Sequence, residues 1–291
     1  MPHLITRLYC RLFVVTICLF TVITIAGAET EKTFRVCADP KNPPFSDRQG
    51  NGFENKIAEL FAKELGQTVA YTWFPQRIGF IRNTLKAKKV PDKDIYKCDV
   101  VMGVPAGYEL TLTTEPYYRS TYVLVYAKNR GWDDIKSPNG VLNLDAARKE
   151  KLRIAMFDRG PGTAWIVNNG LVDQGVPYQS MTGDPDTNSA MTIEKDLQAG
   201  AIDMAIVWGP IAGYLLSNSE PGSFAALPMQ SVPGLKFDFP MSMGVRHADK
   251  AGRDRLNRLI ADKADEIKAI LVEYNVPLVD ANGRLISDLP H

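Results

Sequence analysis

The chain has 291 residues, with 34 Lys and Arg against 33 Asp and Glu, so its net charge is only +1. This near-neutral balance gives no electrostatic support for nucleic-acid binding, which needs concentrated positive charge. The length allows one large domain or two ordinary ones, and 45% hydrophobic residues are enough for a buried core.

The N-terminal segment has the pattern of a secretory signal peptide. Arg7 and Arg11 are its only charged residues before Glu29, residues 12–25 are apolar, and residues 26–28 read Ala-Gly-Ala. The apolar run falls short of the ~20 residues that span a bilayer, so an uncleaved anchor is the less favoured alternative. We expect cleavage after residue 28, and a mature periplasmic protein without a membrane span.

Two cysteines, Cys37 and Cys98, remain after cleavage. Cys37 lies in the first expected strand and Cys98 directly precedes the third, and in an α/β sheet these strands can be neighbours. An oxidising compartment favours a disulfide between them, and a pair of buried thiols is the alternative. The sequence has no CxxC spacing and no nearby His, so a zinc or redox motif is not indicated.

Strands and helices alternate along the mature chain, which indicates the α/β class. Strands are expected at residues 34–38, 69–73, 100–104, 122–127, 152–157, 202–208 and 237–245. Helices are expected at residues 53–65, 76–89, 190–199 and 250–274, and from residue 164 onward.

The expected 76–89 helix has one apolar and one basic side. Ile78, Ile81 and Leu85 have the spacing of an inward face. The other face is basic and is interpreted as solvated rather than as a docking patch; it consists of Arg77, Arg82, Lys86, Lys88 and Lys89.

The strand at 122–127 leads into a new αβ unit, and the chain returns near residue 240. We therefore predict two lobes, residues 29–127 with 240–291 and residues 128–239, after a signal peptide at 1–28. Strands that cross between lobes act as a hinge, and the cleft beside a hinge is where ligands bind.

The sequence offers little catalytic chemistry. It has no GxSxG, HExxH, P-loop or GxGxxG motif, and His247 is the one histidine away from the ends. Asp184, Asp186 and Asn188 match the start of a calcium loop, but Ser189 and Lys195 replace its glycine and glutamate. We therefore expect a non-enzyme without a metal or cofactor of its own.

The order of these motifs resembles the periplasmic solute-binding proteins of polar amino-acid ABC transporters (family 3). The segments that carry the resemblance are residues 34–45, 52–54, 99–104, 115–118, 157–163 and 201–210. The resemblance implies a type II periplasmic binding protein fold, in which two Rossmann-like lobes with mixed sheets are joined by two hinge strands.

Two positions depart from the amino-acid-binding pattern. The arginine that usually grips the ligand carboxylate falls at about Gly107, and the aspartate that usually holds the ammonium, five residues after Asp203, is Trp208. Leaving either charge in a cleft without its counter-charge costs several kcal/mol. An amino-acid ligand is therefore not expected.

A narrower resemblance agrees with these departures. Residues 52–66, 73–85, 98–123 and 157–165 are similar to the quinoprotein-dehydrogenase-associated binding proteins, the J proteins (MxaJ and XoxJ type) of bacterial methanol-oxidation operons. The resemblance implies a periplasmic accessory of a pyrroloquinoline-quinone (PQQ) methanol dehydrogenase, of the calcium or lanthanide type. Its implied partners are that dehydrogenase and the cytochrome c that serves it. The alternative is a receptor that delivers a small non-amino-acid ligand to an ABC permease.

Residues at expected strand ends and loops are the candidates for the cleft. They are Phe45, Glu54, Arg77, Tyr117, Tyr118, Arg119, Arg159, Gly162, Thr163 and Trp208. Aromatic side chains suit an apolar ligand or a protein partner, and the arginines can pair with charge. The glycine loop before residue 164 can present backbone amides to an anion or a carbonyl.

Overall fold

The computed structural model describes residues 32–180 and 188–289, which belong to one unit of the chain, Lys32–His291. The acidic loop at Asp184 and Asp186 lies outside the described residues. Among the residues described, no helix is both long enough and apolar enough to cross a bilayer.

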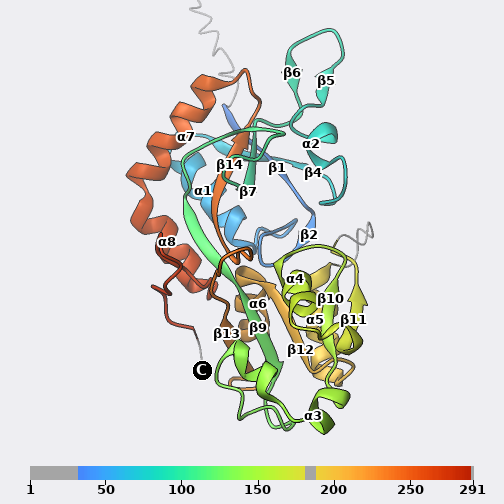
Figure 1. Ribbon diagram of the computed structural model, residues 1–291. Coiled ribbons are helices and arrows are strands. Elements are labelled where there is room, and N and C mark those ends of the chain that lie inside the picture. Colours follow the sequence, from blue (N-terminus) through green and yellow to red (C-terminus); the bar gives the residue numbers. More distant parts are fainter. Residues whose placement is uncertain (1–31, 181–187, 290–291) are drawn as a thin grey trace, which may run out of the picture. The chain divides into compact units, whose positions relative to one another are not determined.

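A connected mixed sheet of ten strands organises this unit (Figure 1). Along the main path the order is β11 (Gly175–Tyr178), β10 (Ile154–Phe157), β12 (Met204–Trp208), β9 (Tyr118–Ala127), β14 (Asp238–Val245), β7 (Val100–Pro105), β1 (Thr33–Ala38) and β4 (Thr68–Trp73). Off this path, β13 (Phe224–Pro228) pairs with β9 and β8 (Leu112–Thr113) pairs with β14.

The first lobe is built on β4, β1 and β7, which run parallel, with β14 antiparallel beside β7. The helices α1 (Phe53–Glu64), α7 (Lys250–Asp262) and α8 (Ala264–Glu273) pack on it. Phe53, Ile57 and Phe61 recur every four residues along α1 and are fully buried. This spacing places all three on one face of the helix, as the sequence predicts.

The second lobe is built on parallel β11, β10 and β12, with β9 antiparallel to β12. Its helices are α3 (Ala146–Lys151), α4 (Pro161–Asn168), α5 (Ser189–Ala199) and α6 (Gly209–Asn218). Leu124 of β9 belongs to one hydrophobic cluster and its neighbours Val123 and Val125 belong to another. Both faces of the sheet are therefore covered, which explains the continuous apolar runs of its strands.

The remaining helices and strands of the described residues are short. They are β2 (Lys41–Asn42), β3 (Ser46–Asp47), α2 (Phe80–Asn83), β5 (Lys88–Val90), β6 (Ile95–Tyr96) and the 3₁₀ turns η1 (Pro138–Asn143) and η2 (Val172–Gln174).

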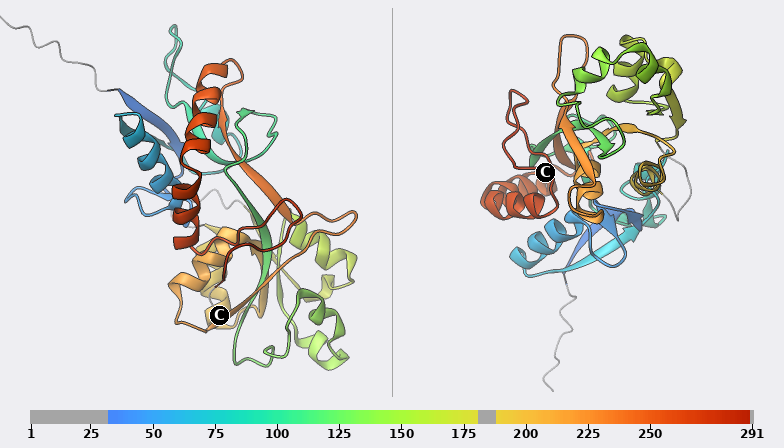
Figure 2. Two further views of the ribbon diagram at one scale, coloured as in Figure 1. Left: turned by 90° about the vertical axis from the view of Figure 1, so that its left-hand side faces the viewer. Right: turned by 90° about the horizontal axis from the view of Figure 1, so that it is seen from below.

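Two strands, β9 and β14, connect the lobes (Figure 2). β9 pairs with β14 from Tyr118 to Thr121, and from Tyr122 onward it pairs with β12 and β13. Side chains fix this crossing point, since the Ser120 hydroxyl donates to the Pro277 carbonyl and the Thr121 hydroxyl donates to the Met229 carbonyl. The expected two-lobed fold with two hinge strands is thus confirmed.

The predicted helix at residues 76–89 is wrong for most of its length. Only Phe80–Asn83 is α-helical, and Gly79 just before it has a left-handed φ of +91°. Ile81 and Leu85 are buried as expected, but Ile78 is 81% exposed. Residues 88–90 instead pair with residues 95–96 as a hairpin, so the basic residues there lie on strands rather than on one helix face.

The C-terminal helix at residues 250–274 is in fact two helices. α7 ends at Asp262 and α8 begins at Ala264, with Lys263 between them. Lys263 forms ion pairs with Glu64 of α1 at 2.8 Å and with Glu266 at 3.5 Å. Leu256, Ile260, Ile267 and Leu271 are buried, whereas Ala264 at the start of α8 is exposed.

Cys37 of β1 and Cys98, which precedes β7, form a disulfide. Their strands are neighbours, with Val36 opposite Val100. The disulfide ties the segment after α2 to the sheet at the point where that segment returns to β7.

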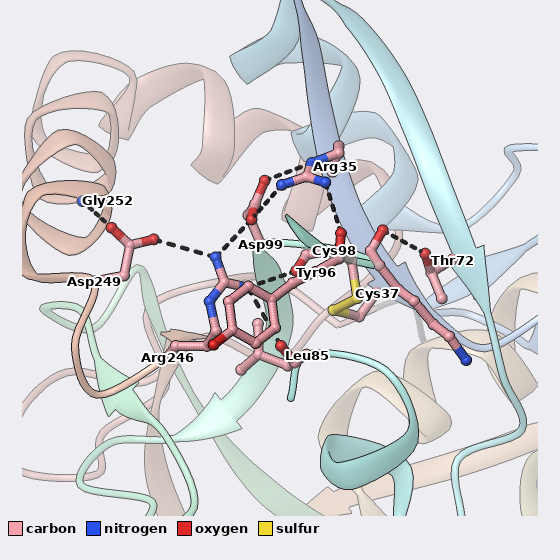
Figure 3. Close-up of polar contacts among 11 residues, drawn as sticks. Arg35, Cys37, Thr72, Leu85, Tyr96, Cys98, Asp99, Arg246, Asp249 and Gly252 are labelled. Atoms are coloured by element: carbon pink, nitrogen blue, oxygen red, sulfur yellow. Dashed lines mark hydrogen bonds and ion pairs between the residues drawn. A yellow bond between two sulfur atoms is a disulfide. The ribbon is translucent and has the colours of Figure 1, made fainter. Parts of the chain in front are cut away.

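An arginine–aspartate–arginine cluster lies beside this disulfide (Figure 3). Arg35 binds Asp99 with two hydrogen bonds of 2.8 Å and also donates to the Tyr96 carbonyl. Arg246 of the loop after β14 donates to Asp99 at 2.6 Å and to the Cys98 carbonyl at 2.7 Å. Its guanidinium also lies 4.2 Å from the centre of the Tyr96 ring. The cluster therefore holds the β6–β7 connection from two sides.

Replacing Arg246 by alanine is expected to lower the free energy of unfolding by about 3 kcal/mol. The substitution removes one of the two cations on Asp99, and it takes a charged donor from the carbonyls of Leu85 and Cys98. Urea unfolding of the purified variant measures the loss.

Arg253→Ala is the matched control for this prediction. Arg253 pairs with the adjacent, exposed Asp254, and such surface pairs contribute about 0.5 kcal/mol. Equal losses in the two variants would contradict a special role for the Arg246 cluster.

Candidate functional site: a pocket between the lobes

Two hollows in the surface are candidates for a ligand or partner site. One, of about 840 Å³, is lined by first-lobe residues between Pro40 and Gly52 and by residues of α5, α6 and α8. The other, of about 520 Å³, lies beside the two hinge strands and collects side chains from both lobes. We take the second as the candidate site, because it has apolar walls, a buried acidic group and most of the predicted residues.

Six of the predicted residues line this inter-lobe pocket. They are Phe45, Glu54, Arg159, Gly162, Thr163 and Trp208. The first two come from the first lobe and the other four from the second lobe, so the pocket depends on both halves of the molecule.

Three aromatic rings from three different strands form the hinge side of the pocket. Trp208 ends β12, Tyr122 lies opposite it on β9, and Phe239 is on β14. The ring centres of Trp208 and Tyr122 are 5.3 Å apart, and that of Phe239 lies 6.1 Å and 6.3 Å from the two. Such tilted and edge-on pairs contribute about 0.5–1.5 kcal/mol each beyond their buried area. The result is a firm apolar wall.

Glu54 is the acidic group in the pocket and sits in the first turn of α1. The residue is half-buried as a whole, but its carboxyl group is enclosed against Gly103, where a Cβ atom would overlap the Glu54 Oε1 atom. Burial, together with the negative charge of Asp39, raises the pKa of Glu54 to about 8. Near neutral pH the carboxyl is therefore mostly protonated, and it can donate a hydrogen bond as well as accept one.

The second-lobe side of the pocket is built by the strand–loop–helix unit of β10 and α4. Gly162 packs so closely on β12 that a Cβ atom there would lie 3.0 Å from Ile206. The Thr163 hydroxyl donates to the Phe157 carbonyl at 2.5 Å, so it closes the turn rather than facing a ligand. Arg159 is exposed at the rim.

A hydrogen bond also joins the lobes across the rim of the pocket. The Asn188 side chain accepts from the Met191 backbone N–H and so caps α5. It also donates to the Lys41 carbonyl of the first lobe at 3.1 Å. This contact connects the two sides of the pocket directly.

The other four predicted residues lie away from the pocket lining. Tyr117 and Tyr118 are 9% and 6% exposed and belong to the core of the first lobe. Arg119 pairs with Asp238 at 2.7 Å across the hinge strands, and the Arg77 guanidinium lies 5.1 Å from the Phe74 ring. Burial, followed by the nearby Glu54 carboxyl, raises the pKa of Tyr118. Tyr118 is therefore a core residue of the first lobe rather than part of the pocket lining.

Sequence reasoning missed several residues that line the pocket. They are Met102, Tyr122, Phe157, Phe239 and Met241. Tyr122 and Phe239 lie on strands that were predicted. Whether their side chains point toward Trp208 depends on the register of those strands. That register follows from pairing between distant segments and has no local signal.

The positions that grip an amino acid in related proteins are occupied differently here. Trp208 stands in the pocket wall, and Asp203 at the start of its strand is already bound to Arg153. Gly107 has no side chain, and its N–H donates to Thr113. Within residues 32–180 and 188–289, no three His, Cys, Asp or Glu side chains gather in an arrangement that could hold a metal ion.

Comparison with solved structures first defines the class of protein. MxaJ from Methlophaga aminisulfidivorans MPT is 22% identical, with a TM-score of 0.68, over 84% of this chain and 100% of that chain. Solved amino-acid-binding proteins share the fold at 16–18% identity. These likenesses concern the fold, and the chain has the mixed α/β fold of a periplasmic binding protein. No protein-family model matches it.

Two relatives then define the family. The periplasmic binding protein XoxJ from Methylobacterium extorquens AM1 is 34% identical, with a TM-score of 0.65, over 85% of this chain and 99% of that chain. Protein MoxJ from Paracoccus denitrificans is 29% identical over 261 residues, which are 85% of this chain and 90% of that protein. The chain belongs to this XoxJ/MoxJ family of periplasmic binding proteins, so the narrower resemblance in the sequence is confirmed.

Proposed function

We propose that this protein is a non-catalytic periplasmic accessory of methanol oxidation. In this proposal it binds a PQQ-dependent methanol dehydrogenase through the inter-lobe pocket. It then assists the activation, assembly or cofactor and metal loading of that enzyme. Membership of the XoxJ/MoxJ family supports this assignment, together with the resemblance of residues 98–123 to accessory proteins of methanol dehydrogenases.

The observation that carries the proposal is the wall formed by Tyr122, Trp208 and Phe239. It puts an indole ring where, by the resemblance, amino-acid-binding proteins have a carboxylate, so this position offers no counter-charge to an ammonium group. Aromatic anchors in a desolvated pocket are typical of the energetic centre of a protein interface. A segment of the dehydrogenase is therefore our preferred occupant.

The proposed location follows from three features of the chain. Residues 1–28 have the signal-peptide pattern, the Cys37–Cys98 disulfide suits an oxidising compartment, and the relative XoxJ is a periplasmic binding protein. We propose that the signal peptide is removed and that residues 29–127 with 240–291, and residues 128–239, act as the two lobes.

The direct test is co-elution on a sizing column of the purified protein with a methanol dehydrogenase, with dehydrogenase activity read in the same fractions. The calcium and lanthanide types are tested separately. A complex with raised activity supports the proposal. No complex and unchanged activity with both types would exclude direct activation.

Trp208→Ala is expected to weaken binding of the dehydrogenase about 30-fold, or about 2 kcal/mol. The substitution removes the largest ring of the pocket wall, and titration calorimetry measures the change. Trp208→Phe keeps an aromatic ring and should retain most of the affinity. Val272→Ala, an exposed position on α8 outside the pocket, serves as the control. Equal affinity of Trp208→Ala and Val272→Ala would place the docking surface elsewhere.

A second candidate function is a receptor for a small ligand that is handed to an ABC permease. The pocket volume of about 520 Å³ favours it, since small-molecule sites occupy about 300–1,000 Å³. In that case a neutral ligand with hydrogen-bonding groups should raise the melting temperature of the protein, and Glu54→Ala, which removes the hydrogen-bonding group, should reduce the shift.

A further inference from the structure

The segment between α2 and β7 forms a basic hairpin, defined here as residues 86–97. It contains five lysines and two aspartates, a net charge of +3, whereas the rest of the chain sums to −2 because the total is +1. All five lysines are exposed, and β5 and β6 form the two arms. Figures 1 and 2 show these arms extending beyond the sheet, at the end of the first lobe that is remote from β10 and β11.

The base of this hairpin is held firmly by several independent contacts. The Lys97 N–H donates to the Ala87 carbonyl, and the Thr72 hydroxyl donates to the Lys97 carbonyl. Arg35 and Arg246 grip the Tyr96 carbonyl and ring respectively, and the disulfide follows at Cys98 (Figure 3). A protrusion whose base is already ordered loses little conformational entropy when it binds a partner.

The exposed part of the hairpin has lysines without an ion pair among the described residues, and it has exposed apolar side chains. Within the described residues, Lys88 pairs with Asp94 at 3.0 Å, whereas no ion pair involves Lys89 or Lys93. Val90 and Ile95 are 38% and 42% exposed. Apolar side chains among unpaired lysines make a surface that suits a protein with complementary negative charge.

We propose that the basic hairpin is a second docking element, which binds an acidic surface of the protein partner outside the inter-lobe pocket. This inference rests on the proposed function, because it takes the methanol dehydrogenase as that partner. Asp92 and Asp94 at the tip disfavour an anionic lipid surface, and no aromatic side chain occupies the tip between β5 and β6. A mixed pattern of charges suits a defined protein surface, because it fixes the register of docking.

The test compares two charge-reversed double variants of the purified protein. Lys89→Glu/Lys93→Glu reverses the sign of two charges on the hairpin. Arg255→Glu/Lys268→Glu makes the same change in net charge at exposed positions of α7 and α8. The association and dissociation rates with each type of methanol dehydrogenase are measured at low ionic strength and at about 0.15 M salt, where the screening length is about 8 Å. The hairpin variant is expected to bind about tenfold more weakly at low ionic strength, mainly through slower association. The association rate of the hairpin variant should also depend less on salt concentration than that of the wild type.

Each alternative result has a distinct meaning. Equal weakening in both variants would show an effect of net charge alone and overturn a specific role of the hairpin. Unchanged binding of the hairpin variant would overturn the inference and leave the proposed function standing. If the wild-type protein binds neither dehydrogenase, the proposed function and the inference both fail. Binding to phosphatidylglycerol vesicles that is lost in the hairpin variant, without any effect on dehydrogenase binding, would assign the hairpin to a membrane surface instead.

Discussion

Removing the disulfide with the Cys37→Ala/Cys98→Ala double substitution is expected to lower the free energy of unfolding by about 4 kcal/mol. The two cysteines are 61 residues apart in sequence, so the link removes much of the conformational freedom of the unfolded chain. Alanine avoids placing a hydroxyl in the core, because Cys37 and Cys98 are 2% and 0% exposed. Urea unfolding, monitored by circular dichroism, measures the difference.

The wild-type protein unfolded in the presence of a reductant is the control for this prediction. It should approach the stability of the double variant, because both lose the same link. Closely similar unfolding midpoints for the oxidised protein and the double variant would mean that the Arg35–Asp99–Arg246 cluster alone holds this part of the fold.

Glu54 is expected to make the stability of the protein fall as the pH rises from about 4.5 to about 8. In this range the unfolded chain has lost the Glu54 proton while the folded protein keeps it, because burial raises the folded pKa to about 8. The stabilisation is fully present below pH 4.5 and is lost as the pH rises through the folded pKa. The loss is on the order of 5 kcal/mol.

The measurement is the free energy of unfolding across this pH range for the wild type and for Glu54→Gln. The glutamine side chain is neutral at every pH, so the variant should gain stability relative to the wild type as the pH rises. Glu59→Gln on the same helix is the control, because Glu59 is exposed and its ion pair with Lys56 lies at the surface. Parallel curves for the wild type and Glu54→Gln would show that the Glu54 carboxyl ionises at an ordinary pH.

The strands were the part of the fold most accessible from sequence. The apolar residues at 100–102 and 204–207 are all buried although successive side chains face opposite sides of the sheet, so consecutive rather than alternate positions carry the signal. The pattern of α1 was equally clear, because Phe53, Ile57 and Phe61 pack against the sheet of the first lobe. In these segments local pattern and tertiary packing favour the same structure.

The segment at residues 76–89 was misread because its local pattern competes with distant contacts. Ile81 and Leu85 do face the core, as a helix would place them. However, Gly79 takes a left-handed conformation, and Arg246, far along the chain, binds the Leu85 carbonyl. A contact across more than 150 residues leaves no trace in the spacing of local side chains.

The candidate site could be predicted only in part for a related reason. Some site residues lie at the end of a strand or in the first turn of a helix, and such positions can be located from sequence. Trp208, Glu54 and Gly162 are of this kind. Tyr117 and Tyr118 also lie at a strand end, but they face the core of the first lobe. Which side of a strand faces the pocket depends on its twist and register, and these are set by its partners.

The strand β9 serves both lobes without interruption, and this restricts how its length can change. Its residues pair with β14 at one end and with β12 and β13 at the other. Adding or deleting one residue within Tyr118–Ala127 would shift every pair beyond that point and turn inward-facing side chains outward. The loops on either side can lengthen or shorten at modest cost in free energy. The length of β9, in contrast, is fixed by its pairing in both lobes.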